Sequence, residues 1–198
     1  MVTIAIQAGG VSTRMGRDKA LVALAGKPLV VHVLERVSSL GDEILLTTNR
    51  PEEYHFLGMP LITDPVPGAG SLAGLQTALR AAHGQIVIVL ACDMPFVSRP
   101  LLEHMLSLAR QAEVVIPSRK GEYEPLQAVY SRECLPAIEA ALAAGERRMI
   151  SFLPRVRVLP IEEAILTRYD PQGLSFFNVN TPQDLAEAER IWATMASN

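Results

Sequence analysis

Two kinds of apolar pattern alternate along the chain: short continuous apolar runs, and longer stretches with an apolar residue every three or four positions. Short continuous runs predict buried strands, and the longer period predicts helices with one apolar face. The expected strands span residues 2–6, 43–48, 59–62, 85–90, 113–117, 155–159 and 176–179, with a loop and a further strand within 121–130. The expected helices span residues 28–41, 71–84, 98–111, 135–144 and 182–195, with Ser71 and Thr181 in N-cap positions.

This alternation predicts the fold class: one α/β domain over residues 1–198, doubly wound and Rossmann-like, with a mainly parallel central sheet. The run at 85–90 is apolar at nearly every position, as in a central strand covered on both faces. In such sheets ligands lie beyond the carboxyl ends of the strands. We therefore expect the loops after the first four strands to meet at one crevice; they carry Gly9-Gly10, Asn49, Asp64 and Asp93.

Composition narrows the classes of function. Hydrophobic residues make up 49% and charged residues 20% of the 198 positions, and the net charge is -3. A mildly acidic chain of this kind is not expected to bind nucleic acid or an anionic membrane surface. No apolar stretch is long enough for a membrane span, and Met1 leads directly into a strand without a leader pattern. Cys92 and Cys134 are too few for a disulfide framework, so we expect a cytoplasmic protein.

The stretch from Ala5 to Lys19 has the character of a phosphate-binding loop. An apolar strand ends in Gly9-Gly10, and the cations Arg14, Arg17 and Lys19 follow within ten residues. Glycines let a ligand approach the main chain, and successive exposed amides bind anions. The spacing fits neither a Walker A loop nor a Rossmann G-x-G-x-x-G fingerprint. We interpret the loop as the triphosphate site of a nucleotide; the alternative is a glycine turn with solvated charges.

Asp93 is the candidate metal ligand, because it follows the apolar run at 85–90 and precedes Met94-Pro95. Mg²⁺ takes oxygen ligands, usually one or two carboxylates together with phosphates and waters. One evident carboxylate favours a single Mg²⁺ as the cofactor. The alternative for Asp93 is an ordinary turn aspartate. Asp64 also ends a strand, and a base or ribose contact and a turn role stay equally open for it.

Six segments together carry a family resemblance that covers nearly the whole chain in order. They are Ala8-Gly-Gly-Val-Ser-Thr-Arg-Met-Gly-Arg-Asp-Lys19, Gly26-Lys-Pro-Leu29, Gly70-Ser-Leu-Ala-Gly74, Cys92-Asp-Met-Pro95, Gly145-Glu-Arg-Arg148 and Asn178-Val-Asn-Thr-Pro182. This set resembles the molybdenum cofactor guanylyltransferases, which belong to the MobA-like nucleotidyltransferases. The first segment is shared across that superfamily and supports nucleotidyl transfer, whereas the last two favour the molybdopterin branch.

The resemblance implies an activity: transfer of GMP from GTP to the terminal phosphate of molybdopterin, with release of pyrophosphate. It implies GTP binding by the main chain at Gln7, Ala8 and Gly9, with Gly10 in the same loop, and nucleotide contacts at Thr47 and Asp64. The catalytic residues that it implies are Arg14 and Lys19, which would hold the phosphates, and Asp93, which would bind both nucleotide and Mg²⁺. It places Asn178 and Asn180 against the molybdopterin.

Two departures from the family pattern keep alternatives open: Gln7 stands where Leu is usual, and Ser71 where Pro is frequent. Gln7 adds a donor and an acceptor beside the base pocket, so a molybdopterin cytidylyltransferase is the nearest rival. A transferase acting on a sugar phosphate or cobinamide phosphate is another, and a non-catalytic nucleotide-binding scaffold is a rival of a different class. Beyond the two substrates, molybdoenzymes or cofactor chaperones are candidate partners.

Overall fold

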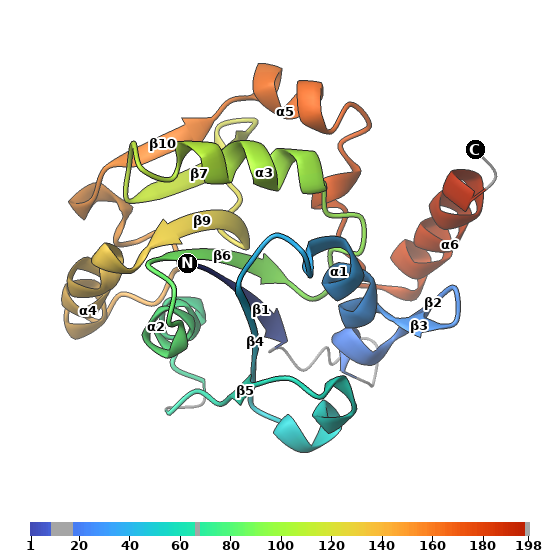
Figure 1. Cartoon of the computed structure of the whole chain (residues 1–198), viewed down its shortest axis with the longest axis horizontal. Coiled ribbons are helices and arrows are strands. Elements are labelled where there is room, and N and C mark those ends of the chain that lie inside the picture. Colours follow the sequence, from blue (N-terminus) through green and yellow to red (C-terminus); the bar gives the residue numbers. More distant parts are fainter. Residues whose placement is uncertain (9–17, 66–67, 197–198) are drawn as a thin grey trace.

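The structure is a computed structural model that describes residues 1–8, 18–65 and 68–196 (Figure 1). Within these residues one sheet of eight strands has the order β10-β7-β9-β6-β1-β4-β5, with β8 paired to β7. Its strands are β1 (Val2–Ala8), β4 (Glu43–Thr48), β5 (Leu61–Ile62), β6 (Ile86–Ala91), β7 (Val114–Arg119), β8 (Glu122–Tyr123), β9 (Gln127–Ser131) and β10 (Val158–Ile161). A separate small hairpin consists of β2 (Ala23–Leu24) and β3 (Lys27–Pro28).

Helices connect the strands. The α-helices are α1 (Leu29–Val37), α2 (Ser71–Ala81), α3 (Arg99–Leu108), α4 (Leu135–Ala143), α5 (Glu163–Tyr169) and α6 (Pro182–Ala196). Short 3-10 helices span Lys19–Leu21, Pro51–Glu53, His55–Leu57, Arg132–Cys134, Leu153–Arg155 and Leu174–Phe176. In the described part of the chain, no helix has the length and apolar character that a membrane crossing requires.

The predicted fold class is confirmed, because the centre of the sheet is parallel. β1 lies parallel to both β4 and β6, and the pairs β4–β5 and β7–β10 are parallel as well. β9 is the exception and runs antiparallel to β6 and β7. Only β8 and short turns separate β9 from β7, and a parallel return needs a longer crossover.

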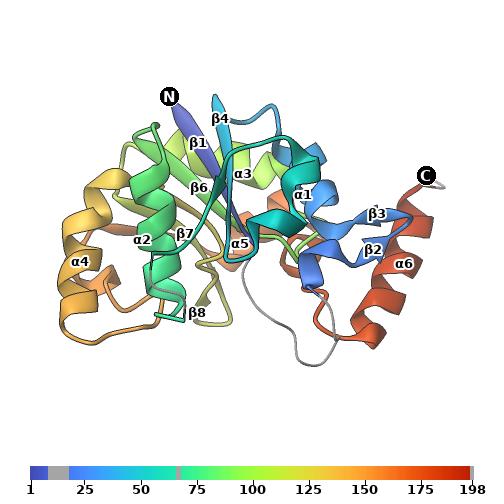
Figure 2. The ribbon, with the colours of Figure 1, turned by 90° about the horizontal axis from the view of Figure 1, so that it is seen from below.

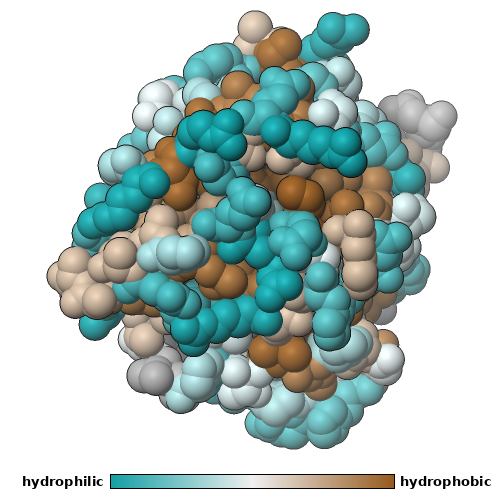
Figure 3. Space-filling view, turned by 60° about the vertical axis from the view of Figure 1, so that its left-hand side comes forward, coloured by the Kyte–Doolittle hydropathy of each residue, from teal (hydrophilic) through white to brown (hydrophobic). Residues whose placement is uncertain are grey.

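Alternate residues of β1 face two different hydrophobic clusters, as expected from the two-residue period of a strand. Ile4 and Ile6 pack in a cluster with residues of α1 and α3, while Ala5 packs in a second cluster with residues of α2 and α4. Figures 1 and 2 show these helix pairs on opposite sides of the sheet. A third cluster joins α6 to the β2–β3 hairpin. The face seen in Figure 3 is mostly hydrophilic, with apolar residues scattered among the polar ones.

Several predicted elements differ from the structure. Residues 176–179 are not a strand: the 3-10 helix Leu174–Phe176 is followed by a segment without strand pairing. The strand expected at 155–159 is β10 and begins at Val158, because a 3-10 helix with proline in its first turn occupies Leu153–Arg155. Helix α5 was not predicted.

The two N-cap predictions have different outcomes. Thr181 caps α6 as expected: its Oγ1 accepts from Asp184 N at 3.1 Å, while Asp184 Oδ2 accepts from Thr181 N at 2.8 Å. Ser71 is not an N-cap. Gly70 holds that position without a side-chain cap, and the Ser71 hydroxyl instead donates to the main-chain oxygen of Arg147 at 3.4 Å.

Candidate functional site

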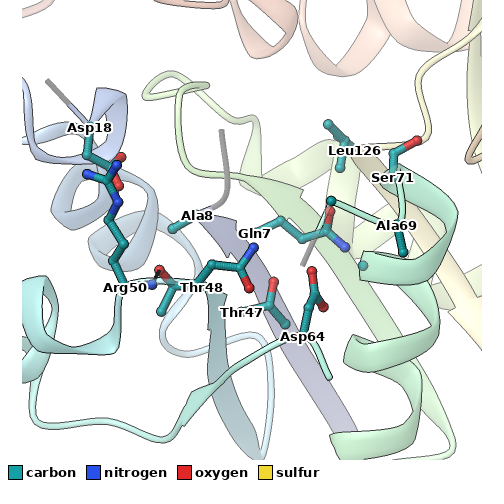
Figure 4. Close-up of a pocket in the computed structure, with 14 residues that line it drawn as sticks. Gln7, Ala8, Asp18, Thr47, Thr48, Arg50, Asp64, Ala69, Ser71 and Leu126 are labelled. Carbon is teal, nitrogen blue, oxygen red and sulfur yellow. Dashed lines mark hydrogen bonds between the residues drawn. The ribbon is translucent and has the colours of Figure 1, made fainter. Parts of the chain in front are cut away.

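A cavity of about 430 Å³ opens at the carboxyl ends of β1 and β4, below the start of α2 (Figure 4). Its lining residues are Gln7, Ala8, Asp18, Thr47, Thr48, Asn49, Arg50, Asp64, Gly68, Ala69, Gly70, Ser71, Gly74 and Leu126. A second cavity of about 100 Å³ is lined by Gln7, Asp18, Lys19, Ala91, Cys92, Asp93 and Leu126. Because Gln7, Asp18 and Leu126 line both, the two cavities adjoin and form one crevice.

The wall of the crevice forms where an apolar sheet face becomes polar. On the α2 side, Ala5 and Leu45 are fully buried among apolar neighbours. Two residues further along the same strands, the same face carries Gln7 and Thr47, which are partners in the parallel register. Helix α2 continues over this part of the sheet with Gly74, which has no side chain to fill the space. Polar groups therefore face a cavity where the strands end.

Lys19 and Asp93 lie close together in the lining of the smaller cavity. Lys19 Nζ lies 3.8 Å from Asp93 Oδ2, with 24% and 17% of the two side chains exposed. The Lys19 ammonium also donates to Asn180 Oδ1. The main chain fixes this arrangement, because Val179 N donates to Asp93 O at 3.0 Å and Cys92 N donates to Gln7 O at 3.2 Å. Segments far apart in the sequence thus converge on one ammonium group.

Burial raises the pKa values of two acidic groups in this lining, Asp93 and Cys92. It raises the pKa of Asp93, and the nearby Lys19 charge opposes that rise without cancelling it. The pKa of the neighbouring Cys92 thiol is raised strongly, chiefly by burial. Cys92 is therefore a neutral packing residue rather than a nucleophile, in line with its place in the α1–α3 cluster.

Two buried polar atoms at the larger cavity lack a hydrogen-bond partner among the residues that the structure describes: Gln7 Nε2 and Asp64 Oδ1. Both side chains lie against Gly74. A Cβ placed there would be 3.8 Å from Gln7 Nε2, from Gln7 Oε1 and from Asp64 Oδ2. Figure 4 shows both side chains in the space between the strands and α2. Buried polar atoms are nearly always paired in folded proteins, so this pair is suited to a polar ligand.

The Gly145–Arg148 turn supports the start of α2. Arg147 O accepts from Leu72 N at 3.1 Å, and its guanidinium donates to Leu142 O at 3.3 Å and Glu146 O at 3.0 Å. Gly70 adopts φ +98° with its Cα against Arg147, where a Cβ would lie 3.1 Å from the arginine's main-chain oxygen. Within the described residues, this turn is a structural support for the cavity wall.

The structure brings together most of the predicted site residues. Gln7, Ala8, Thr47 and Asp64 line the larger cavity, and Lys19 and Asp93 line the smaller one. Asn180 contacts Lys19, and Asn178 lies two residues earlier on the same segment. Gly9, Gly10 and Arg14 lie outside the described residues.

Among the lining residues of the crevice that sequence reasoning did not single out are Asp18, Arg50 and Leu126. Arg50 follows the polar end of β4, and Asp18 precedes Lys19, so position after a strand and next to a predicted cation were the available signals. Leu126 gave no such signal, because it lies immediately before the antiparallel strand β9. Two residues close to it in the sequence are engaged elsewhere: Gln127 is fully buried and donates to Ser175 Oγ, while Glu124 pairs with Arg119 at 3.3 Å.

The two carboxylates that line the smaller cavity fit one Mg²⁺ better than a metal centre built entirely from protein ligands. Asp93 and Asp18 both line the smaller cavity. No group of three or more His, Cys, Asp or Glu side chains suited to a metal occurs in the described ranges 1–8, 18–65 and 68–196. One or two carboxylates completed by phosphates and waters is the usual Mg²⁺ arrangement at nucleotide sites.

Comparisons with known proteins identify the family of the chain. The model of the MobA-like NTP transferase domain matches residues 4–158. A probable molybdenum cofactor guanylyltransferase from Carboxydothermus hydrogenoformans is 34% identical over 97% of this chain and 97% of its own. A molybdenum cofactor guanylyltransferase from Desulfosudis oleivorans is 35% identical, covering 95% and 94%. The crystal structure of molybdopterin-guanine dinucleotide biosynthesis protein A from Archaeoglobus fulgidus superposes with a TM-score of 0.84 at 34% identity, covering 98% of this chain and 100% of that one.

Proposed function

The chain belongs to the MobA-like NTP transferase family, and we propose that it transfers GMP from GTP to the terminal phosphate of molybdopterin, releasing pyrophosphate. It is a nucleotidyltransferase by its family. The names of its relatives over nearly the whole chain support guanine as the base and molybdopterin as the acceptor. The product is the guanine dinucleotide form of the cofactor.

One observation carries the proposal: Lys19 and Asp93 meet at 3.8 Å beside a cavity of a size suited to a small molecule. Lys19 follows the glycine-rich segment in the sequence and Asp93 lies two residues after β6, so a triphosphate bound by Lys19 would lie next to Asp93. In this proposal the base lies in the larger cavity between Gln7, Asp64 and Gly74. Thr47 contacts the nucleotide from the end of β4.

The phosphates would lie between Lys19 and the N-terminal loop, with Gly9, Gly10 and Arg14 supplying amides and a further cation. Fixed positive charge stabilises the charge that develops on the departing pyrophosphate, and it needs no reorganisation during the reaction. Mg²⁺ held by Asp93, with Asp18 beside it, would add neutralisation of the phosphate charge. Arg50 lines the same cavity and pairs with Glu53 at 3.2 Å, which fixes a further cation at its edge.

The acceptor is itself a phosphate anion, so the attack requires no strong protein base. The main barrier is to bring two anions together in line, and positioning supplies that. Asn178 and Asn180 are the proposed acceptor contacts. Their segment is fixed to Asp93 through Val179 N and to Lys19 through Asn180. Acceptor and nucleotide would therefore approach the same ammonium group from two sides.

The test is a panel of nucleoside triphosphates with Mg²⁺, each with and without molybdopterin, scored by pyrophosphate release. We expect release with GTP only when the acceptor is present. Release with CTP in place of GTP would identify a molybdopterin cytidylyltransferase instead. Binding of GTP with no release on adding acceptor would favour the non-catalytic scaffold. Release driven by a sugar phosphate or cobinamide phosphate would reassign the acceptor.

The proposed function also includes a cofactor, a location and partners. Mg²⁺ as cofactor is supported by the carboxylates Asp93 and Asp18, which line the smaller cavity. A cytoplasmic location is supported by Cys92 and Cys134, both of which are free and buried. Molybdoenzymes or cofactor chaperones are proposed as partners because the product must pass to the enzymes that use it.

A further inference from the structure

Gln7 places an amide on the face of β1 that carries the apolar Ala5 two residues earlier. Ala5, the preceding residue on the same face, is fully buried against the α2–α4 cluster. Gln7 extends that face to the end of the strand, with Thr47 beside it in register on β4 and Ala91 in register on β6. Its side chain therefore enters the larger cavity at the level where the packed core ends.

The Gln7 amide nitrogen is buried and has no acceptor among the described residues, and Asp64 Oδ1 is a buried acceptor without a donor there. Leaving such a group unpaired destabilises a fold, whereas pairing it with a ligand stabilises the complex. Gly74 borders both side chains, since a Cβ placed there would be in van der Waals contact with each of them at 3.8 Å. One donor and one carboxylate thus face the same small volume.

Guanine complements that pair better than the other common bases. Its edge presents the O6 acceptor, then the N1–H donor and the 2-amino donor. An ionised carboxylate only accepts and takes two donors at once, while an amide nitrogen only donates. Cytosine offers a single donor group beside two acceptors, and adenine a single donor group beside one acceptor, so each leaves part of the carboxylate without a donor.

We propose that the Gln7 side chain contributes to base specificity, its Nε2 donating to O6 of guanine while Asp64 accepts from N1–H and the 2-amino group. This inference rests on the proposed function and adds to it a side-chain role for Gln7. The family resemblance implies only a main-chain contact at this position. Gln7 is a specificity residue, because it contacts the base and not the phosphates that react.

The experiment measures binding of GTP, 6-thio-GTP and ITP by calorimetry with Mg²⁺ and without acceptor, so the readout does not depend on turnover. Sulfur is a weak acceptor, so 6-thio-GTP removes the Gln7 bond and keeps N1–H. ITP removes only the 2-amino group that Asp64 accepts from. We expect the wild-type protein to bind 6-thio-GTP about tenfold more weakly than GTP, the value of one neutral hydrogen bond.

In Gln7→Leu the preference for GTP over 6-thio-GTP should fall to about twofold or less, while the preference for GTP over ITP persists. Gln7→Met keeps the length of the side chain and should show the same low preference for GTP over 6-thio-GTP. This variant separates the loss of the hydrogen bond from a gain of room for the sulfur atom. It also replaces the leucine variant if that variant folds poorly. Gln85→Leu is the matched control, because Gln85 is exposed and lies at the amino end of β6, whereas the crevice lies at the carboxyl ends of the parallel strands.

Equal discrimination against 6-thio-GTP in the wild-type protein and in both variants would overturn the Gln7 assignment and leave the proposed function standing. Absence of discrimination in the wild-type protein would overturn it as well. Failure of the wild-type protein to bind any of the three triphosphates would overturn the proposed function and this inference with it.

Discussion

Asp93 combines three properties of the site: it is mostly buried, it lies two residues after the core strand β6, and it is close to the Lys19 ammonium group. Its main-chain oxygen also anchors the proposed acceptor segment through Val179 N. The carboxylate is therefore a functional group on a rigid support. Its replacement by an isosteric amide should change charge with little change of shape.

We predict that Asp93→Asn folds with a melting temperature close to that of the wild-type protein. It should lose about 10²–10³ in turnover, the range seen when one preorganised electrostatic group is removed. Pyrophosphate release under saturating GTP and acceptor measures the loss, and a thermal melt controls for folding. Near-native turnover in this variant would remove Asp93 from the mechanism.

The acid side of the pH profile tests the Lys19–Asp93 pair. Burial raises the pKa of Asp93 and Lys19 lowers it, so protonation begins at a higher pH than for an exposed aspartate. Since the ionised form is the proposed active form, kcat/KM for GTP should fall as pH falls through this raised pKa. In Lys19→Met the opposing charge is gone, so the fall should begin at still higher pH.

The matched control for Lys19→Met is Lys27→Met, which removes an exposed lysine that pairs with Glu35 at 2.6 Å. That variant should keep the wild-type profile. Lys19→Met should also weaken GTP binding, because Lys19 is the proposed phosphate contact. An acid limb at the same pH in Lys19→Met and the wild-type protein would show that Lys19 does not act on Asp93.

At the scale of elements, the start of α2 depends on Gly70. Its φ of +98° is accessible to glycine, and a Cβ there would meet the Arg147 main-chain oxygen at 3.1 Å. We predict that Gly70→Ala lowers the free energy of unfolding by about 1–3 kcal/mol and raises KM for GTP, because α2 borders the base cavity. Urea unfolding and steady-state kinetics measure the two effects.

Gly121→Ala separates strain from contact in this prediction. Gly121 also has a positive φ, +83°, but no described atom lies within 4 Å of a Cβ placed there, and it lines neither cavity of the crevice. This variant should show the backbone strain without displacing α2, and KM for GTP should stay near the wild-type value. Equal KM values in the Gly121 and Gly70 variants would show that the Arg147 contact does not shape the cavity.

The acceptor segment depends on a buried serine. Ser175 Oγ accepts from Ser98 N at 2.8 Å and from the Gln127 amide, and both Ser175 and Gln127 are fully buried. We predict that Ser175→Ala costs about 1–3 kcal/mol in the free energy of unfolding, since it leaves buried donors unpaired. It should raise KM for molybdopterin more than KM for GTP, because the segment after Ser175 carries Asn178 and Asn180.

Ser107→Ala is the control for this prediction, since the Ser107 hydroxyl is exposed and donates only within its own helix, to His104 O at 2.6 Å. It should leave stability and both KM values nearly unchanged. A larger rise in KM for GTP than for molybdopterin in Ser175→Ala would place the segment on the nucleotide side instead.

At the scale of the whole molecule, local patterns predicted the centre of the sheet well. β1, β4 and β6 are mainly apolar, and polar residues at or just after their carboxyl ends line the crevice. Patterns failed where pairing depends on distant partners. The antiparallel direction of β9 follows from the short connection after β7, and residues 176–179 form no strand although they contain apolar side chains.

For the site, the sequence predicted residues at strand ends but not the contacts between distant segments. Strand ends and spacing pointed to Asp64, Thr47 and Asp93, and the structure shows them around one crevice. The contact between Lys19 and Asn180 joins residues from opposite ends of the chain, and no local pattern carries it. The unpaired amide of Gln7 likewise emerges only from the packing of α2 over β1.

The central claim is that the N-terminal anion-binding loop and the end of β6 act on the same triphosphate. A double-mutant cycle on kcat/KM for GTP tests it, with Lys19→Met, Asp93→Asn and the double variant. Groups that act as a unit are strongly non-additive, so we predict that the double variant stays within about tenfold of the slower single variant. A double variant whose loss equals the product of the two single losses would contradict the shared site.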